Sequence, residues 1–251
     1  MTTILEMCAV EKRYGTGEAE VVALSGIDLQ VASGELVAVM GPSGSGKSTL
    51  LNLAGGLDVP TAGTVSVGGR SLADLSPTEL ATVRRRNVGY VFQRLNLIPS
   101  LTALENVMLP LELDGKGRDE TAEAAASALA DAGFTGSADR FPDDLSGGEQ
   151  QRVAIARAVV GDRTLLLADE PTGALDTATG EQVLELLSAR ARAGAAVVLV
   201  THEPRFASYA DRVVLLREGR PVERPLGTVR GRGGGTSCGW RAARRVAARV
   251  A

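Results

Sequence analysis

Residues 41–48 read GPSGSGKS and fill every fixed position of the phosphate-binding pattern G-x-x-x-x-G-K-[ST]. The apolar run 36–40 before them is typical of a buried strand, and residues 49–53 after them have helical character. In a strand–loop–helix unit of this kind, backbone N–H groups and the positive end of a helix dipole surround a phosphate. A Gly- and Ser-rich turn without a binding role is a common alternative, but a complete match in this context leaves it little support.

The chemistry expected of this loop follows from its side chains and its backbone. Lys47 is expected to reach the β- and γ-phosphates of a nucleotide, and Ser48 to hold Mg²⁺. The nucleotide-binding residues predicted in this stretch are Gly41, Ser43, Gly44, Ser45, Gly46, Lys47, Ser48 and Thr49.

A second apolar run, residues 164–168, ends in the adjacent carboxylates Asp169 and Glu170. Successive side chains of a strand point to opposite sides, so the two acids need not share a role. Asp169 can bind a metal ion through water, while Glu170 can polarise an attacking water molecule. A solvent-facing acid pair is ordinary at strand ends of α/β proteins, and the phosphate-binding loop upstream is what favours the catalytic interpretation.

Between these two segments, residues 145–150 read LSGGEQ, and the three segments together resemble the nucleotide-binding subunit of an ATP-binding cassette (ABC) transporter. The resemblance runs over about residues 4–222. It implies an α/β P-loop NTPase fold of ABC type, with a mostly parallel sheet, an antiparallel β subdomain and a helical subdomain that carries the LSGGEQ signature. The implied cofactors are ATP and Mg²⁺, and the implied reaction is hydrolysis of ATP to ADP and phosphate.

The signature implies a second subunit. In the family, Ser146 and Gly148, with Gly147 between them, would contact the γ-phosphate of ATP held by the partner's phosphate-binding loop, so one copy cannot build a complete site. The helix that follows is expected at about residues 150–160, with its N-terminus facing a phosphate. The structural alternative is a Ser146 N-cap with Glu149 in the first helical turn, and the two interpretations are compatible.

Four further positions match the family in the expected order. Gln93 matches the glutamine that senses Mg²⁺ and the attacking water, although a lone exposed glutamine is usually only solvated. Asp176 matches an aspartate that communicates across the dimer, or else caps a helix over 177–192. His202, the only histidine in the chain, matches the residue that reports on the γ-phosphate, although a lone histidine is more often structural. Tyr14 matches the aromatic residue that stacks on adenine, although surface aromatics also occur.

Composition limits the remaining possibilities. The 251 residues carry one set of motifs, which argues for one nucleotide-binding domain at 1–223. No apolar run approaches the ~18 residues of a membrane span, so the channel is expected in another polypeptide. The start lacks the features of a secretory signal, so we expect a cytoplasmic protein on the inner face of the membrane. Cys8 and Cys238 form no disulfide or metal pattern.

The coarse organisation follows from the apolar runs. Residues 4–31 resemble the antiparallel part, and residues 36–92 and 164–216 are expected to supply the strands of the parallel sheet. The helical subdomain is expected at about 94–160, including a helix over 120–132. A permease contact is expected at Leu95, Asn96, Leu97, Ile98 and Pro99, with burial inside the subdomain as the alternative.

The stretches 86–107 and 171–176 are similar to the branch of the family that contains the lipoprotein-releasing, macrolide-export and cell-division ATPases. This implies an ATPase that forms a homodimer, or an ABC heterodimer, around two ATP and drives a separate integral membrane permease for export or extraction. The alternative is an ATP-dependent regulator or scaffold of a membrane-bound cell-wall or division complex. Nucleic-acid binding is not expected, because neither a long coiled-coil insertion nor a second motif set is present.

The end of the chain departs from the family pattern. Residues 224–251 contain seven Arg and no acid, so residues 1–223 carry 20 basic and 30 acidic residues, a balance of −10. Residues 231–235 are typical of a flexible linker, and 240–250 could form a basic helix on anionic lipid or on the acidic body. A solvated tail without a role is the alternative. Pro221 is expected to end the last strand or to place it at a sheet edge.

Overall fold

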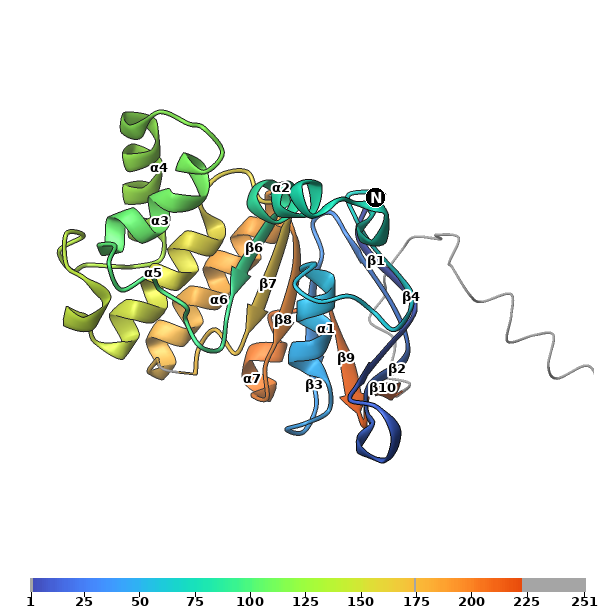
Figure 1. The fold of residues 1–251 in the computed structure, drawn as a ribbon. Helices are drawn as coiled ribbons and strands as arrows, with labels where there is room; N and C mark the ends of the chain where they lie inside the picture. The colour runs from blue at the N-terminus through green and yellow to red at the C-terminus, as the bar shows by residue number, and fades with distance from the viewer. Residues whose placement is uncertain (1, 174, 223–251) are drawn as a thin grey trace, which may run out of the picture.

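The computed structural model describes residues 2–173 and 175–222, and these residues form two β-sheets and a group of helices (Figure 1). The larger sheet contains β3 (Leu36–Met40), β6 (Val88–Val91), β7 (Leu165–Asp169), β8 (Ala196–Val200), β9 (Arg212–Arg217) and β10 (Arg220–Val222). Its order is β10-β9-β3-β8-β7-β6, and every neighbouring pair is parallel except β10 with β9. All residues of β7 and β8 are buried, as expected for central strands covered on both faces.

The smaller sheet is antiparallel and corrects one expectation. It contains β1 (Thr3–Tyr14), β2 (Val21–Ala32), β4 (Ala62–Val67) and β5 (Arg70–Ser71), in the order β2-β1-β4-β5. Residues 62–71 were expected in the parallel sheet with the rest of 36–92, and this was wrong. In β4 the buried Val65 and Val67 flank the partly exposed Ser66, and this alternation suits a strand with only one face on the core.

Seven α-helices and three short 3-10 helices lie within the described residues. The α-helices are α1 (Lys47–Ala54), α2 (Pro77–Asn87), α3 (Ala103–Glu112), α4 (Arg118–Asp131), α5 (Gly147–Val159), α6 (Thr177–Arg192) and α7 (Pro204–Ala207). The 3-10 helices are η1 (Gly17–Ala19), η2 (Leu72–Asp74) and η3 (Pro142–Asp144). In Figure 1, α3, α4 and α5 gather at one side of the molecule, and α1 and the antiparallel sheet lie at the other.

Local sequence explains where several helices begin. Capping boxes start α2 at Ser76, α3 at Thr102 and α5 at Ser146, each with a glutamate three residues later. Helix α5 therefore begins at Gly147, three residues before the expected start. Helix α6 begins after Asp176, whose side chain accepts a hydrogen bond from the Thr179 N–H, and its bounds are those predicted.

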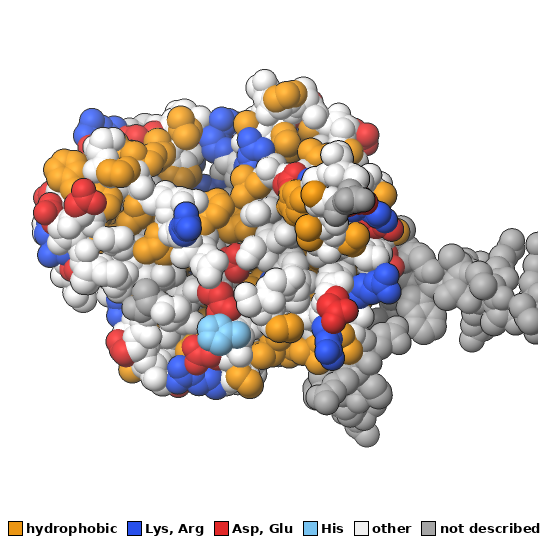
Figure 2. Space-filling model, turned by 60° about the horizontal axis from the view of Figure 1, so that its bottom comes forward, with side chains coloured by type: hydrophobic (Ala, Val, Ile, Leu, Met, Phe, Trp, Pro, Cys, Tyr) orange, Lys and Arg blue, Asp and Glu red, His pale blue; other side chains and the backbone are white. Residues whose placement is uncertain are grey.

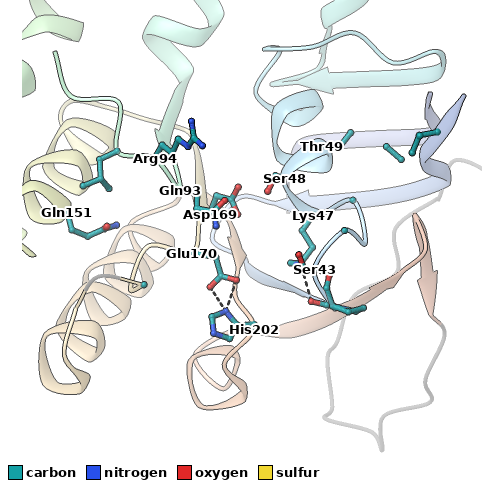
Figure 3. A pocket seen from close by; sticks show the side chains of 18 of the residues that line it. Ser43, Lys47, Ser48, Thr49, Gln93, Arg94, Gln151, Asp169, Glu170 and His202 are labelled. Carbon is teal, nitrogen blue, oxygen red and sulfur yellow. Dashed lines mark hydrogen bonds and ion pairs between the residues drawn. The ribbon is translucent and has the colours of Figure 1, made fainter. Parts of the chain in front are cut away.

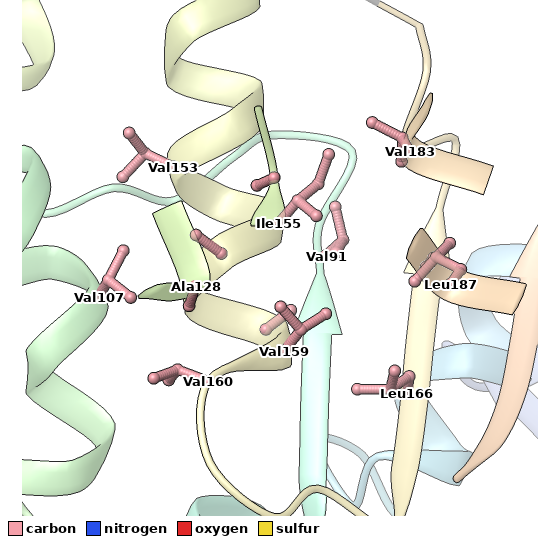
Figure 4. Close-up of a cluster of buried hydrophobic side chains, with 14 of the residues drawn as sticks. Val91, Val107, Ala128, Val153, Ile155, Val159, Val160, Leu166, Val183 and Leu187 are labelled. Carbon is pink, nitrogen blue, oxygen red and sulfur yellow. The ribbon is translucent and has the colours of Figure 1, made fainter. Parts of the chain in front are cut away.

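Two clusters of buried apolar side chains hold β7 from opposite faces. Leu165 and Leu167 belong to the cluster shared with α1 and the antiparallel sheet. Leu166 and Ala168 belong to the cluster shared with α3 to α6, part of which Figure 4 shows around Ile155. Because successive side chains of β7 are fixed on both faces, the carboxyl end of this strand is held firmly in place.

Other expectations fall at the margins of the fold. Pro221 lies in β10 at the edge of the larger sheet, as predicted. Within 2–173 and 175–222, no helix has both the length and the apolar character needed to cross a membrane. The predicted basic tail at 224–251 and the boundary at 223 lie outside the described residues. The division into a domain, a helical subdomain and a tail therefore stays a prediction.

Candidate nucleotide-binding site

The phosphate-binding loop connects β3 to α1, and its glycines are required by close backbone neighbours. Gly46 has φ +98°, in the left-handed region, and a Cβ there would overlap the main-chain carbonyl of Ala23. A Cβ at Gly41 would overlap the carbonyl of Leu216. The loop can therefore take this path between two sheets only with glycine at both positions, and the path turns the start of α1 toward a cavity (Figure 3).

Lys47 lies across the loop that precedes it. Its Nζ atom donates hydrogen bonds to the carbonyl oxygens of Gly41, at 2.9 Å, and Pro42, at 2.8 Å. These contacts place the ammonium group at the mouth of the loop, where a phosphate oxygen can replace a carbonyl as acceptor. The neighbouring Ser45 is buried and does not line the cavity, so any contact of this residue with a phosphate uses its backbone.

Ser48 and Asp169 form the second part of the site. Ser48, at the start of α1, and Asp169, at the end of β7, both line the cavity. Burial raises the pKa of Asp169 and is the largest cause, the charge of Glu170 adds to this shift, and the Ser48 hydroxyl and the charge of Lys47 oppose it. Two hard oxygen donors side by side fit Mg²⁺, which takes few protein ligands and completes its shell with phosphate oxygens and water. The described part of the chain contains no cluster of three or more His, Cys, Asp or Glu suited to a metal. A Mg²⁺ ion held by one carboxylate, one hydroxyl and phosphate oxygens does not need such a cluster.

Glu170 and His202 follow the neighbouring strands β7 and β8 and contact each other. The Nδ1 atom of His202 lies 2.9 Å from both carboxylate oxygens of Glu170 (Figure 3). The hydrogen bond with Glu170, followed by its charge, raises the pKa of His202. Glu170 has φ +50°, which is strained for a residue with a side chain, and its N–H donates to the Val200 carbonyl at 3.0 Å.

A cavity of about 910 Å³ brings most of the predicted residues together. The predicted residues that line it are Gly41, Ser43, Gly44, Gly46, Lys47, Ser48, Thr49, Gln93, Gly147, Asp169, Glu170 and His202. They come from the loop before α1, the segment after β6, the start of α5 and the ends of β7 and β8. The single histidine, pale blue in Figure 2, lies at the surface beside acidic side chains on this face.

Five predicted residues do not line this cavity: Tyr14, Ser45, Ser146, Gly148 and Asp176. Tyr14 is 42% exposed and its hydroxyl donates to Asp58 at 2.9 Å. Burial raises the pKa of the Tyr14 hydroxyl, while Thr49, which does line the cavity, is close enough to oppose this shift. Tyr14 therefore lies at the margin. Ser146 and Asp176 cap α5 and α6, as the structural alternatives predicted.

The cavity wall also includes residues that were not predicted to bind a nucleotide: Val21, Val22, Ala23, Pro42, Arg94, Gln151, Gly173 and Leu95, the last of which was predicted as a permease contact. No signal in the sequence pointed to Val21, because its 61% exposure and its pairing with Tyr14 in the register of β1 and β2 appear only in the structure. Two adjacent exposed valines beside an aromatic residue suit a flat apolar ligand. Gln151 could not be predicted either, because the place of its side chain depends on the packing of α5.

A phosphate-binding loop, a carboxylate pair and a histidine at the same end of a parallel sheet define a nucleotide-binding P-loop ATPase. Residues 24–173 match the family described as ABC transporter, and the chain belongs to this family. The predicted family and fold class are therefore confirmed.

Known relatives agree with this assignment. The chain is 44% identical over 225 residues to the macrolide export ATP-binding/permease protein MacB of Salmonella typhimurium; this covers 90% of the chain and 35% of MacB. It thus spans about a third of the length of MacB. It is 45% identical over 219 residues to YknY of Bacillus subtilis, an uncharacterised ABC transporter ATP-binding protein; this covers 87% of the chain and 95% of YknY.

Solved structures of one protein, MJ0796, are also similar. A dimeric structure of MJ0796, described as a bacterial ABC transporter cassette, has a TM-score of 0.84 and 43% identity, and the match covers 90% of this chain and all of that one. A second MJ0796 structure, with the same TM-score, identity and coverage, is described as a dimeric post-hydrolysis state bound to ADP and Pi.

Proposed function

We propose that this chain is the ATP-hydrolysing subunit of a transporter, which dimerises around two ATP and drives a separate membrane permease for export or extraction. The observation that carries the proposal is the convergence on one cavity of Lys47, Ser48, Gln93, Asp169, Glu170 and His202, which come from four separate segments.

The chain's own residues supply the binding functions. Lys47 exchanges its loop carbonyl acceptors for β- and γ-phosphate oxygens, and the backbone N–H groups of residues 43–49 hold the remaining oxygens. Ser48 and Asp169 hold Mg²⁺, with Gln93 as a further ligand at the edge of the cavity. When bound, Mg²⁺ neutralises phosphate charge. Tyr14, at the cavity margin beside Val21, stacks on adenine.

Glu170 is the general base of the hydrolysis. Its carboxylate accepts a proton from the water whose oxygen attacks the γ-phosphorus, while the bond from that phosphorus to the ADP oxygen breaks. His202 orients this carboxylate through its hydrogen bond and can contact a γ-phosphate oxygen through the other ring nitrogen. Gln93 helps to hold the water.

Dimer formation completes the site. Ser146 and Gly148 lie outside the cavity of their own chain, at the start of α5, and we propose that they reach the γ-phosphate held by a second copy. Asp176 would communicate between the two sites. The support comes from MJ0796, at 43% identity, whose structures are described as dimeric.

The permease is proposed to be another polypeptide on the membrane, with this chain on the cytoplasmic face. The support is the name of MacB, which joins an ATP-binding part to a permease in a protein of which this chain spans about a third. The proposed contact is the segment Leu95 to Pro99, where Ile98 is exposed and Leu97 packs against the core. Arg157 fixes the segment by donating to the carbonyls of Leu95 and Asn96.

Glu170→Gln tests this function. The variant should bind ATP as well as the wild type does, lose turnover by at least ~100-fold because the base is absent, and stay dimeric with ATP and Mg²⁺ by light scattering. Hydrolysis at the wild-type rate would contradict the role of Glu170.

The trapped variant can then be captured from membranes with ATP, with its partners identified by mass spectrometry. A permease with a large extracytoplasmic domain supports the transporter. Capture of a division or cell-wall complex without transport favours the regulatory alternative, and capture of only soluble or ribosomal partners contradicts both.

A further inference from the structure

One buried polar side chain beside the cavity has no use in the mechanism above. Gln151, in the second turn of α5, is only 3% exposed, and its Nε2 atom has no hydrogen-bond partner among the described residues. An amide donor that is buried without a partner is costly, and native structures keep few of them. The side chain nevertheless lines the cavity and projects toward the part that holds Glu170 (Figure 3).

The preceding residue on α5 provides a contrast. The Nε2 atom of Gln150 donates to the carbonyls of Pro142, at 2.9 Å, and Leu145, at 3.1 Å. Gln150 therefore holds the start of α5 to the segment before it, as a structural amide does. Two adjacent glutamines on one helix thus differ in their hydrogen bonding, and only Gln151 has a donor left to use.

The segment after Glu170 lies against the same part of α5. A Cβ at Gly148 would lie 3.6 Å from the side chain of Leu175, and Arg152 donates to the Thr179 hydroxyl at 3.0 Å. Gln151 is three residues after Gly148, so the two share one side of the helix. Gly173, in the turn after Glu170, lines the cavity together with Gln151.

The turn that follows Glu170 needs support from its surroundings. Glu170 has a strained positive φ, and such a backbone persists only when neighbouring groups hold it. The Gly173 N–H donates to the Glu170 carbonyl at 3.1 Å, so the turn 171–173 sets the direction of this residue. Among the described residues, the Gly173 carbonyl accepts no hydrogen bond.

We infer that Gln151 is a positioning residue for the general base: its Nε2 donates to a main-chain carbonyl of the turn 171–173 when nucleotide fills the cavity, and so fixes the Glu170 carboxylate for catalysis. The inference rests on the proposed role of Glu170. It assigns to the second turn of α5 a task within its own subunit, separate from the proposed contact of Ser146 with a second copy.

The test uses Gln151→Met, which keeps the length of the side chain and removes the donor. Because an unpartnered buried amide is lost, the melting temperature without nucleotide should stay equal or rise. The kcat for ATP hydrolysis should fall at least tenfold, with KM for ATP changed less than twofold. Gln151→Glu, whose carboxylate has the same shape and no donor once it is ionised, should not restore kcat at alkaline pH. The control Gln150→Met should lower the melting temperature, because it removes two hydrogen bonds.

A second readout follows the turn directly. With AMP-PNP and Mg²⁺ bound, amide hydrogen exchange at residues 171–173 should be faster in Gln151→Met than in the wild type. An unchanged kcat in Gln151→Met, or restoration by Gln151→Glu, overturns the inference while the wild type still hydrolyses ATP. A wild-type chain that binds ATP without hydrolysing it overturns the proposed function, and the inference with it.

Discussion

At the scale of single residues, the hydrogen bond between Glu170 and His202 joins the proposed base to the only imidazole of the chain. The protonation of His202 can therefore be followed without interference from other histidines. The hydrogen bond and charge of Glu170 raise the pKa of His202 above the ordinary value of about 6.5. The stabilisation from this pair is fully present below the ordinary value and is lost as pH rises through the raised pKa.

We expect an NMR titration of the His202 ring, with nucleotide and metal removed, to show this raised pKa. In Glu170→Gln the charge is gone, so the pKa should return toward its ordinary value. Equal pKa values in the two proteins would mean that the contact does not persist in solution.

Motifs predicted some of the residues of the candidate site, and other residues could not be predicted from the sequence. The loop residues and the acids at 169 and 170 were predicted because their spacing follows directly from a strand, a loop and a helix. Gln151 was not, because nothing in the sequence distinguishes it from Gln150; only burial and partners do. The positive φ of Glu170 is likewise not indicated by any local residue pattern; the structure shows it together with a hydrogen bond from the Glu170 N–H to the Val200 carbonyl.

At the scale of elements, two similar helix starts allow one function to be separated from another. Ser146 and Thr102 both accept a hydrogen bond from the N–H of a glutamate three residues later, in capping boxes. Ser146→Ala and Thr102→Ala should each lower the free energy of unfolding by about 1 kcal/mol, measured by urea denaturation. Only Ser146→Ala should also weaken ATP-dependent dimerisation, since Ser146 alone is proposed to reach a second copy. Equal dimerisation of the two variants would limit Ser146 to its role as a cap.

The bounds of helices were predicted best where a capping residue marks the start of the helix. Helix α6 starts where it was predicted because Asp176 caps it, and the capping box at Ser146 starts α5 three residues before the start expected from the resemblance. Which strand pairs with which was harder to predict from the sequence. Strands β4 and β5 follow the first helix of a parallel unit in the sequence, but β4 pairs with β1 and β5 pairs with β4. Pairing between distant segments has little effect on local composition, so the sequence pattern did not indicate it.

At the scale of the whole molecule, nucleotide binding should be visible as stability. A ligand that binds only the folded chain raises its free energy of unfolding by about 2.7 kcal/mol at a concentration about 100 times its dissociation constant. We expect ATP with Mg²⁺ to raise the melting temperature of the wild type and of Glu170→Gln. Lys47→Ala should lose most of this rise, because its donor to the phosphates is missing. A rise that persists undiminished in Lys47→Ala would place the nucleotide elsewhere.

The closeness of the phosphate-binding loop to two sheets has a consequence for the order in which the protein is made. Gly46 lies against a carbonyl of β2, and Gly41 lies against a carbonyl of β9, from opposite ends of the described chain. A ribosome completes the loop early and reaches Leu216 only near the end of the domain. The nascent chain therefore contains its phosphate-binding loop long before strand β9, which packs against that loop, has been made. We expect the chain to become able to bind a nucleotide only late in synthesis.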